Sequence, residues 1–533
     1  MASPCRFLIW VLILGSTLSF PAVDAFSFNF SGNSRLAGII FPAPLTFNAA
    51  ATADSGCGSH HRLAADGGPP EYAPSMKLHL KKHPPSAEKT RNEALFDSTQ
   101  KDSLRIQTLY RRITEKKNQS PLSTLAAAAK VEDLRFQSAA PAPAPAFSGR
   151  LSATVESGVA LGSGEYFIDV FIGTPPRHFS LILDTGSDLN WVQCLPCHAC
   201  FEQHGPLYDP SASSSYSNIG CADPRCGLVS HPENSAACPS KTGNDQAFCP
   251  YFYWYGDHSN TTGDLATETF TVNLTAGGAA ISRKVEGVIF GCGHWNRGLF
   301  HGAAGLLGLG RGPLSFASQL RSLYGHAFSY CLVERNSDLS VNSKLIFGED
   351  PALLADPNLK FTSFATGKEN PAETFYYLQI KGVKIAGEML DIPPETWVVS
   401  ENGTGGTIID SGTTLSYFSD PAYRIIKEAI EKKVTYHVFD EFPVLSPCYN
   451  VSGVEKVQVP ELSIVFADGE VWDFPVENYF IRLEPEGIMC LAILGTPRSS
   501  LSIIGNYQQQ NFHILYDTKQ SRLGFAPMKC AEV

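Results

Sequence analysis

Short apolar runs separated by glycine and proline dominate the chain after residue 165. The clearest of them span 166–172, 179–183, 284–290 and 375–380. Runs of this length, bounded by turn residues, are typical of β-strands, and their regular recurrence predicts an all-β body. One clear helix is expected within that body, over 420–433, with Asp420 as its N-cap and Pro421 in its first turn.

The first 25 residues carry the pattern of a secretory signal peptide. One basic residue, Arg6, precedes an apolar run over 7–18, and small residues follow as far as Ala25. A membrane anchor is the alternative, but the run is shorter than the roughly 20 residues that a bilayer requires. We therefore expect a signal peptide over 1–25, entry into the secretory pathway and no membrane anchor.

Residues 26–150 differ from the body in charge. They carry 16 Lys+Arg against 10 Asp+Glu, a net charge of +6, whereas residues 151–533 carry 24 against 41, a net charge of −17. Opposite charges favour docking of this basic leader on the acidic body, and protonation of carboxylates in acid would weaken it. The sequence therefore predicts a propeptide over 26–150 and a zymogen; a basic solvated tail is the alternative.

Within the leader, the pattern predicts one ordered element. Residues 26–75 are rich in small residues and proline and are expected to be partly disordered, whereas leucine and isoleucine among charges over 93–113 indicate an amphipathic helix. Alternating alanine and proline over 139–146 predicts an extended linker that a protease can cut. The mature chain is expected to start near 145–160.

The cysteines agree with a secreted protein. Beyond Cys5 and Cys57, an even number remains, which predicts six disulfides without giving their pairing. These are Cys194, Cys197, Cys200, Cys221, Cys226, Cys238, Cys249, Cys292, Cys331, Cys448, Cys490 and Cys530. The CxxCxxC run is compatible with a metal or iron–sulfur site in a reducing compartment, but oxidised thiols do not ligate metal, so no metal or cofactor is expected.

Asparagine sequons in the body are further marks of the secretory pathway. An Asn-x-Ser/Thr sequence in a secreted chain is a candidate for glycosylation on an exposed loop. The four candidates are Asn260, Asn273, Asn402 and Asn450. We therefore expect a glycoprotein.

The decisive feature is an internal repeat. Ile-Leu-Asp-Thr-Gly-Ser at 182–187 recurs as Ile-Ile-Asp-Ser-Gly-Thr at 408–413, and two apolar residues and a glycine follow downstream of each copy. A buried strand rarely ends in an ionisable group without a partner, so the two acids, Asp184 and Asp410, are expected to meet. The repeat predicts two related lobes, at 151–360 with a cysteine-rich insertion at 194–250, and at 361–533.

These segments resemble those of the pepsin-like aspartic proteases, specifically the plant nepenthesin-type branch. The resemblance spans roughly 165–530 and rests on DTGSDLNW at 184–191, DSGTT at 410–414, YGDHS at 255–259, FGCGH at 290–294 and the insertion itself. A single DTG is weak, but paired motifs with downstream glycine elements and a YGD segment between them are specific. The resemblance implies a bilobal all-β fold with the active site in the cleft between the lobes.

By this resemblance the catalytic residues are Asp184 and Asp410. Two carboxylates a few ångströms apart share one proton, as in pepsin; one then protonates the scissile carbonyl while the other activates a water, without a covalent intermediate. The implied supporting residues are the bracing hydroxyls Thr185 and Ser411, the hydroxyls on the outer carboxylate oxygens, Ser187 and Thr413, and the turn glycines Gly186 and Gly412.

The resemblance also implies a flap over the cleft. Tyr255 matches the family's flap tyrosine, Gly256 and Asp257 follow it, and Trp191 matches the tryptophan that hydrogen-bonds it. His258 stands where the family often has glycine, so the turn of this flap is expected to differ. An exposed loop histidine and a pH-responsive one are both compatible with that position.

We expect a secreted, acid-active endopeptidase that acts on polypeptide substrates and docks its own propeptide. The acidic body disfavours nucleic acid as a partner, and a monomer is expected. The cell exterior or cell wall is the favoured location, and the vacuole is also compatible. The alternative is a catalytically silent pepsin-fold binding or inhibitor protein, which the retained acids, hydroxyls and flap residues disfavour.

Overall fold

The computed structural model describes one leader helix and most of the body. The described residues are 91–116, 151–157, 164–230, 238, 247–255, 259–276, 279–298, 300–335, 337, 343–366, 372–400, 404–440, 442, 444–483, 487–496 and 501–532. The predicted signal peptide, the segment 26–75 and the linker at 139–146 lie outside them and remain predictions. Among the described helices, none is long and apolar enough to cross a membrane.

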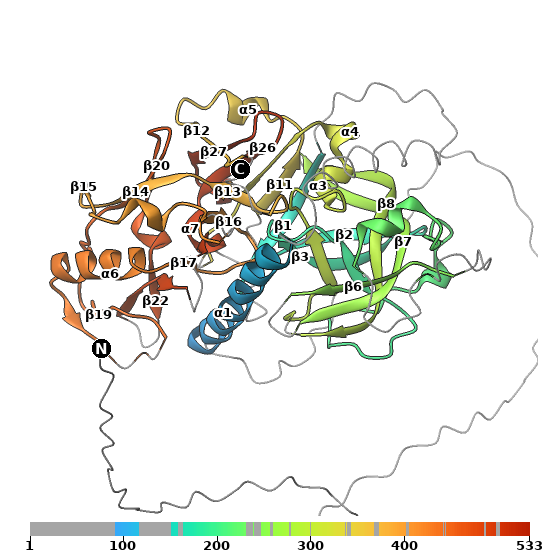
Figure 1. The fold of residues 1–533 in the computed structure, drawn as a ribbon, viewed down its shortest axis with the longest axis horizontal. Coiled ribbons are helices and arrows are strands. Elements are labelled where there is room, and N and C mark those ends of the chain that lie inside the picture. The colour runs from blue at the N-terminus through green and yellow to red at the C-terminus, as the bar shows by residue number, and fades with distance from the viewer. Residues whose placement is uncertain are drawn as a thin grey trace, which may run out of the picture. The chain divides into compact units, whose positions relative to one another are not determined.

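β-Strands are the main regular element of the described body, as predicted (Figure 1). The large sheet runs, in spatial order, through β12 (Lys360–Ser363), β27 (Arg522–Pro527), β26 (Phe512–Asp517), β10 (Ala327–Cys331), β11 (Ser343–Phe347), β1 (Leu151–Ser157), β2 (Tyr166–Ile172), β3 (Arg177–Asp184), β9 (Gly305–Gly308), β4 (Trp191–Gln193), β8 (Ala279–Arg297), β7 (Asn260–Ala276) and β5 (Ser217–Asn218). β6 (Pro250–Trp254) pairs with β7. This sheet therefore contains strands from both predicted lobes, and the boundary at 360/361 stays a prediction.

Three smaller sheets lie in the second half of the chain. The first contains, in spatial order, β13 (Tyr376–Leu378), β16 (Thr407–Ile409), β25 (Ser502–Ile504), β17 (Ser416–Phe418) and β24 (Ile493–Gly495). The second contains β15 (Glu388–Met389), β14 (Ile380–Ile385), β20 (Leu462–Phe466) and β21 (Val471–Phe474). The third contains β18 (His437–Val438), β19 (Cys448–Asn450), β23 (Ile488–Leu491) and β22 (Phe480–Leu483). The first of these sheets carries the second copy of the repeat.

The two parts of each repeat copy pair with each other in the same way. β3 and β9 are parallel, with Ile182 opposite Leu306, and β16 and β25 are parallel, with Ile408 opposite Ile503. Each parallel pair ends at its acid. The downstream apolar-apolar-glycine element is therefore the strand that flanks the acid-bearing strand in both halves.

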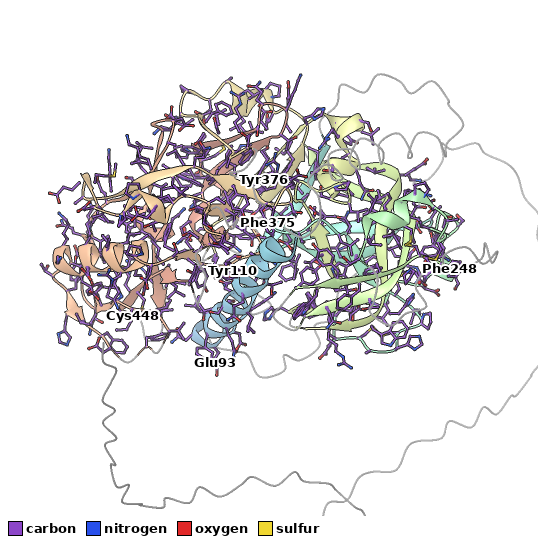
Figure 2. All side chains as sticks on the ribbon, viewed as in Figure 1. Glu93, Tyr110, Phe248, Phe375, Tyr376 and Cys448 are labelled. Carbon is purple, nitrogen blue, oxygen red and sulfur yellow. A yellow bond between two sulfur atoms is a disulfide. The ribbon has the colours of Figure 1, made fainter. Side chains whose placement is uncertain are left out.

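Helices are few and mostly short among the described residues. They are α1 (Arg91–Lys116), α3 (Phe316–Gln319), α4 (Arg321–Tyr324), α5 (Pro351–Leu354), α6 (Ala422–Lys433) and α7 (Asn506–Gln509). α1 covers the predicted leader helix, and Figure 2 shows Glu93 near one end of it and Tyr110 toward the other.

The helix predicted at 420–433 forms, but its predicted cap is wrong. α6 begins at Ala422, its N-cap residue is Pro421, and no side chain caps it. Asp420 lies one position before the cap residue, where a side chain does not take the N-cap role, and Pro421, without an N–H group, takes that position.

All twelve predicted disulfide cysteines pair, and the structure supplies the pairing that spacing did not give. The six disulfides are Cys194–Cys292, Cys197–Cys200, Cys221–Cys238, Cys226–Cys249, Cys331–Cys530 and Cys448–Cys490. Four of them involve the cysteine-rich insertion, where Phe248 is 53% exposed at the edge of the view (Figure 2). Since a disulfide restricts the unfolded chain, these links stabilise an insertion that has few strands of its own.

Candidate active site

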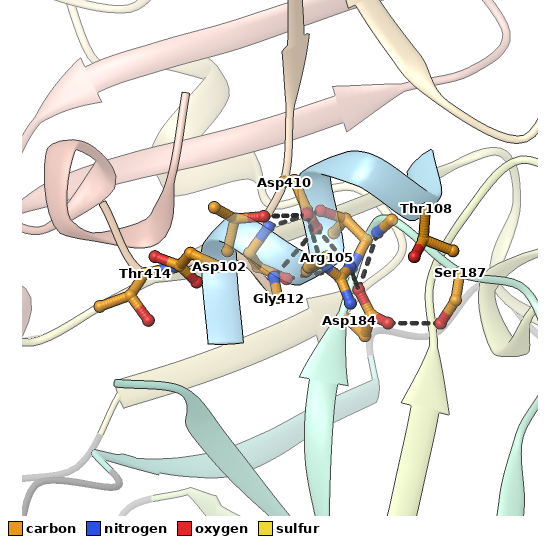
Figure 3. A network of polar contacts seen from close by, with 12 residues as sticks. Asp102, Arg105, Thr108, Asp184, Ser187, Asp410, Gly412 and Thr414 are labelled. Atoms are coloured by element: carbon orange, nitrogen blue, oxygen red, sulfur yellow. Dashed lines mark hydrogen bonds and ion pairs between the residues drawn. The ribbon is translucent and has the colours of Figure 1, made fainter. Parts of the chain in front are cut away.

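Asp184 and Asp410 lie at the ends of two buried strands that face each other. Asp184 is the last residue of β3, Asp410 follows β16, and both side chains are fully buried. Apolar strand residues such as Leu183 and Ile409 fix the two loops in the core. Figure 3 shows the two carboxylates close to one guanidinium group.

Thr185 and Ser411 join the two acid-bearing loops by reciprocal hydrogen bonds. The backbone N–H of Thr185 donates to Ser411 Oγ at 3.0 Å, and the backbone N–H of Ser411 donates to Thr185 Oγ1 at 2.9 Å. Ser411 Oγ also donates to the carbonyl of Leu183 at 2.9 Å. These bonds are buried, so they are little weakened by water and hold the carboxylates in a fixed relation.

Each carboxylate accepts the same two local hydrogen bonds. Ser187 Oγ donates to Asp184 Oδ2 at 2.5 Å, and Thr413 Oγ1 donates to Asp410 Oδ2 at 2.6 Å. The backbone N–H two residues after each acid donates to its Oδ1 at 3.0 Å, from Gly186 and Gly412. Hydrogen bonds to a carboxylate favour its ionised form, so both half-sites stabilise negative charge.

Glycine is required at positions 186 and 412 because no space is left there for a Cβ atom. A Cβ atom on Gly186 would lie 2.6 Å from Asp410 Oδ1, and one on Gly412 would lie 2.4 Å from Asp184 Oδ1. Each glycine thus borders the carboxylate of the opposite half. Any larger residue would push the two acids apart.

Trp191 and Tyr255 form one contact beside the acids. Trp191 Nε1 donates to the Tyr255 hydroxyl at 2.7 Å, and the ring of Phe300 packs edge-on against both. Tyr255 follows β6, so this bond ties the hairpin of β6 and β7 to the strand after Asp184. Gly256, Asp257 and His258 lie outside the described residues, and the predictions for them remain predictions.

Arg105, which was not among the site residues predicted from the sequence, lies between the two acids. Its Nη2 is 2.5 Å from Asp184 Oδ1 and 3.1 Å from Asp410 Oδ1, and its Nε is 2.9 Å from Asp410 Oδ2 (Figure 3). Arg105 belongs to α1, so a leader side chain bridges the two carboxylates. A planar guanidinium suits this contact because its donors point in a fixed fork.

Burial and this ion pair act in opposite directions on the pKa of Asp184 and on that of Arg105. Burial alone would raise the pKa of Asp184, but the Arg105 guanidinium and the bond from Ser187 outweigh it and lower its pKa below the ordinary value. Burial likewise favours neutral Arg105, yet the two carboxylates raise its pKa well above normal. With the leader in place, the structure therefore favours a charged arginine on an ionised Asp184.

A second leader residue, Asp102, caps the loop after Asp410. Its carboxylate accepts the backbone N–H groups of Thr414 at 2.9 Å and Leu415 at 3.1 Å, and the Tyr417 hydroxyl at 3.2 Å. Burial raises the pKa of Asp102 to about 7, against these two N–H groups, which lower it. Asp102 thus anchors the helix on the second half-site, one turn before Arg105, which bridges both.

The sequence of the leader does contain a pattern that indicates these two residues. Leu95, Ile106 and Leu109 form the buried apolar stripe of α1, and Asp102 and Arg105 fall at the same helical spacing. Charged residues within an apolar stripe need partners when the stripe is buried. Their partners lie between 79 and 315 residues away in sequence, and the helical pattern alone does not reveal them.

Two of the predicted glycosylation sites are described with their side chains. Asn260 begins β7 and is half-buried, and Asn450 ends β19 and is exposed. The side chain of Asn273 and the whole of Asn402 lie outside the described residues. Modification of these four sites remains a prediction.

Two family models match the body of the chain. Residues 166–349 match the one described as xylanase inhibitor N-terminal, and residues 375–527 match the one described as xylanase inhibitor C-terminal. Together they cover both copies of the repeat.

Among curated proteins, plant aspartic proteases are similar over most of the chain. Aspartyl protease family protein 2 of Arabidopsis thaliana is 36% identical over 449 residues, which cover 84% of this chain and 83% of that protein. Aspartic proteinase nepenthesin-2 of Nepenthes gracilis is 39% identical over 382 residues, which cover 71% and 81%.

Among solved structures, edgp and a seed globulin share the fold. The structure titled edgp has a TM-score of 0.59 at 22% identity and covers 74% of this chain and 97% of its own. Conglutin gamma, a basic 7S globulin from lupine seeds, has a TM-score of 0.55 at 21% identity and covers 71% and 95%. At this identity the likeness concerns the fold alone.

Proposed function

Because the chain belongs to the pepsin-like aspartic proteases of the plant nepenthesin-type branch and is an aspartic-type endopeptidase, we propose that Asp184 and Asp410 hydrolyse peptide bonds in acid through a shared water. The observation that carries this proposal is the matched pair of half-sites. Each acid has a hydroxyl on its outer oxygen, an N–H on its inner oxygen and a brace to the other half. Relatives that are proteases favour it over the alternative of a silent binding protein.

The proposed chemistry follows from two neighbouring carboxylates that share a proton. The ionised acid takes a proton from a water molecule as the water oxygen attacks the peptide carbon. The protonated acid gives its proton to the carbonyl oxygen, which produces a neutral tetrahedral intermediate. When that intermediate collapses, the C–N bond breaks and the acid that took the water proton gives it to the departing amine. The other acid takes a proton from a hydroxyl group of the intermediate, which restores the starting state of the pair. The hydrogen bonds from Ser187 and Thr413 keep the outer oxygens oriented throughout.

The leader helix is proposed to inhibit this site in an inactive precursor. Arg105 takes the space between the carboxylates where the water and the scissile bond would lie. Asp102 occupies backbone donors of the adjacent loop, and Leu95, Ile106 and Leu109 belong to the same apolar cluster as Leu415 and Tyr417. A polypeptide substrate and α1 would therefore compete for one cleft.

Acid is proposed to release the helix through the catalytic acids. Arg105 lowers the pKa of Asp184 in the docked state, so this contact stabilises docking at neutral pH. That contribution is lost as the pH falls through the docked pKa and the carboxylate is protonated. Asp102 acts with the opposite sign, because its docked pKa is raised: its contribution is largest at low pH and is lost as the pH rises through about 7. Release in acid therefore depends on the Arg105 contact outweighing Asp102.

Secretion, maturation and glycosylation complete the proposal. The predicted signal peptide, the disulfides and the exposed Asn450 sequon support a monomeric glycoprotein of the cell exterior or cell wall, with the vacuole as the other location. Microscopy of a tagged full chain and a mass decrease on enzymatic removal of N-glycans test these two points.

Digestion of casein by the purified full chain tests the catalytic proposal. We expect cleavage at pH 3–5, preceded by shortening of the chain, and complete inhibition by the transition-state analogue pepstatin. At pH 7 the intact chain is expected to be inactive. Cleavage that resists pepstatin, or the absence of cleavage at every pH, would contradict the proposed mechanism. Maturation of Asp184→Asn at the wild-type rate would show that another protease removes the leader.

A further inference from the structure

A third charged residue of α1 contacts the cleft one turn before Arg105. The Lys101 ammonium group forms an ion pair with Glu165, a residue of the body just before β2. Glu165 is only 3% exposed and Lys101 only 9%. The pair is thus a buried contact between the leader and the wall of the cleft, separate from the two catalytic acids.

The surroundings of this pair are those of a site for a cation. Lys101 Nζ lies 5.9 Å from the centre of the Phe300 ring, and Glu165, Ile182, Tyr255 and Leu306 line the same pocket. A carboxylate at the base and an aromatic face at the side favour an ammonium or guanidinium group on an apolar stem. With α1 in place, about 20 Å³ of this pocket remains unfilled.

The spacing along α1 gives the position of this pocket relative to the scissile bond. Lys101 precedes Arg105 by four residues, which is about 6 Å along a helix. An extended substrate covers about 3.3 Å per residue, so the same distance corresponds to about two residues from the catalytic acids. The side chain that reaches Glu165 in a substrate would belong to that position.

We propose that Glu165 is a specificity residue, and that it selects lysine or arginine about two residues from the scissile bond. The inference rests on the proposed catalytic role of Asp184 and Asp410 and on removal of α1 from the cleft. Once Lys101 leaves, a lysine or arginine of the substrate takes its place in the ion pair with Glu165 and in the contact with Phe300. Norleucine, which has the apolar stem of lysine without the charge, would make only the contact with Phe300.

A matched peptide series tests this proposal with the acid-activated full chain. Each peptide carries one apolar cleavage pair and lysine, norleucine or glutamate two residues from the bond, on one side or the other. The assay is run at pH 5, within the range proposed for cleavage. On one of the two sides we expect kcat/KM for lysine to exceed that for norleucine about tenfold or more, with glutamate lowest.

Two substitutions assign the preference to this carboxylate. Glu165→Gln keeps the shape and removes the charge, so the lysine-to-norleucine ratio is expected to fall to about twofold or less while norleucine cleavage is retained. Glu388→Gln, an exposed residue paired with Lys433, is the matched control and should keep the wild-type ratio.

The outcomes separate the subsite from the catalytic proposal. A wild-type enzyme that cleaves the norleucine peptide but shows no lysine preference on either side overturns the role of Glu165, and this result needs no variant. A preference that Glu165→Gln leaves unchanged overturns it as well. If none of the peptides is cleaved, the proposed catalytic function fails, and the subsite with it.

Discussion

The two half-sites share one scaffold but hold different parts of the molecule. In the first half β4 lies antiparallel to β9, with Trp191 opposite Leu306, and in the second β17 lies antiparallel to β25, with Tyr417 opposite Ile503. Trp191 and Tyr417 each come seven residues after the acid of their half. Trp191 donates to Tyr255, the expected flap tyrosine, whereas Tyr417 donates to Asp102 of the leader.

The loop just after each acid shows the same contrast. Asp188 is bonded within the body, where its carboxylate accepts the N–H of Gly312 at 2.8 Å and the Thr374 hydroxyl at 3.0 Å. Thr414, at the corresponding position after Asp410, instead donates its N–H to the leader through Asp102. The repeat thus preserves the pair of acids, while the equivalent positions around them bind Tyr255 in the first half and the leader residue Asp102 in the second.

Substitution of each acid in turn tests whether the two acids are equivalent, and it should have the largest effect. Asp184→Asn and Asp410→Asn should each lower kcat of the activated enzyme by about 10³-fold or more, because either change removes one partner of the proton exchange. Casein and peptide cleavage measure it, with the exposed Asp473→Asn as control. Substantial activity in one of the two variants would break the proposed symmetry.

Arg105 is the contact that both halves make with the leader. Arg105→Ala leaves two buried carboxylates without their cation, so inhibition of the intact chain at neutral pH should weaken by about 100-fold. The initial rate of peptide cleavage by the full chain measures this before any leader is removed. Gln107→Ala, an exposed position on the same helix, should behave as wild type. Equal inhibition in both variants would mean that Arg105 does not hold the leader.

Asp102 should give docking of the leader a pH dependence of its own. In wild type, ionisation of Asp102 should weaken docking of the leader as the pH rises through about 7. Asp102→Asn resembles the protonated carboxyl group and does not ionise, so docking of this variant should not weaken in this way. The ratio of full-chain to activated-enzyme activity at pH 5, 6 and 7 measures it. From pH 5 to pH 7 we expect this activity ratio to change at least about tenfold less in Asp102→Asn than in wild type. An identical pH profile would contradict the assignment.

The smallest effects separate the two halves most sharply. Trp191→Phe should lower kcat/KM of the activated enzyme about two- to tenfold through loss of one hydrogen bond to the flap, with little effect on leader inhibition. Tyr417→Phe should weaken leader inhibition by a similar factor and leave the activated enzyme near wild type. If either substitution changes both properties equally, the division of labour between the halves is wrong.

Much of this arrangement was predictable from the sequence because its signal is local. The acid, hydroxyl and glycine around Asp184 and Asp410 recur in order, and the apolar residues before them mark buried strands. The strand over 166–172 was found for the same reason. The N-cap at Asp420 was wrong because the structure starts α6 one residue later than the proline pattern suggested.

The remainder depends on contacts between distant segments. Arg105 lies 79 residues from Asp184 and 305 from Asp410 in sequence, and no helical pattern specifies where its stripe will pack. Glu165 was overlooked because a lone acid before a strand is ordinarily solvated. The disulfide pairing was inaccessible for the same reason, since Cys331 and Cys530 are 199 residues apart.

Hydrogen exchange of α1 in the intact chain at pH 7 measures whether Arg105 holds the leader helix on Asp184 and Asp410. It reports docking without relying on activity. We expect amides of residues 91–116 to be protected in wild type and in Gln107→Ala, and to lose about 100-fold of that protection in Arg105→Ala. Equal protection in all three proteins would contradict a role of Arg105 in docking.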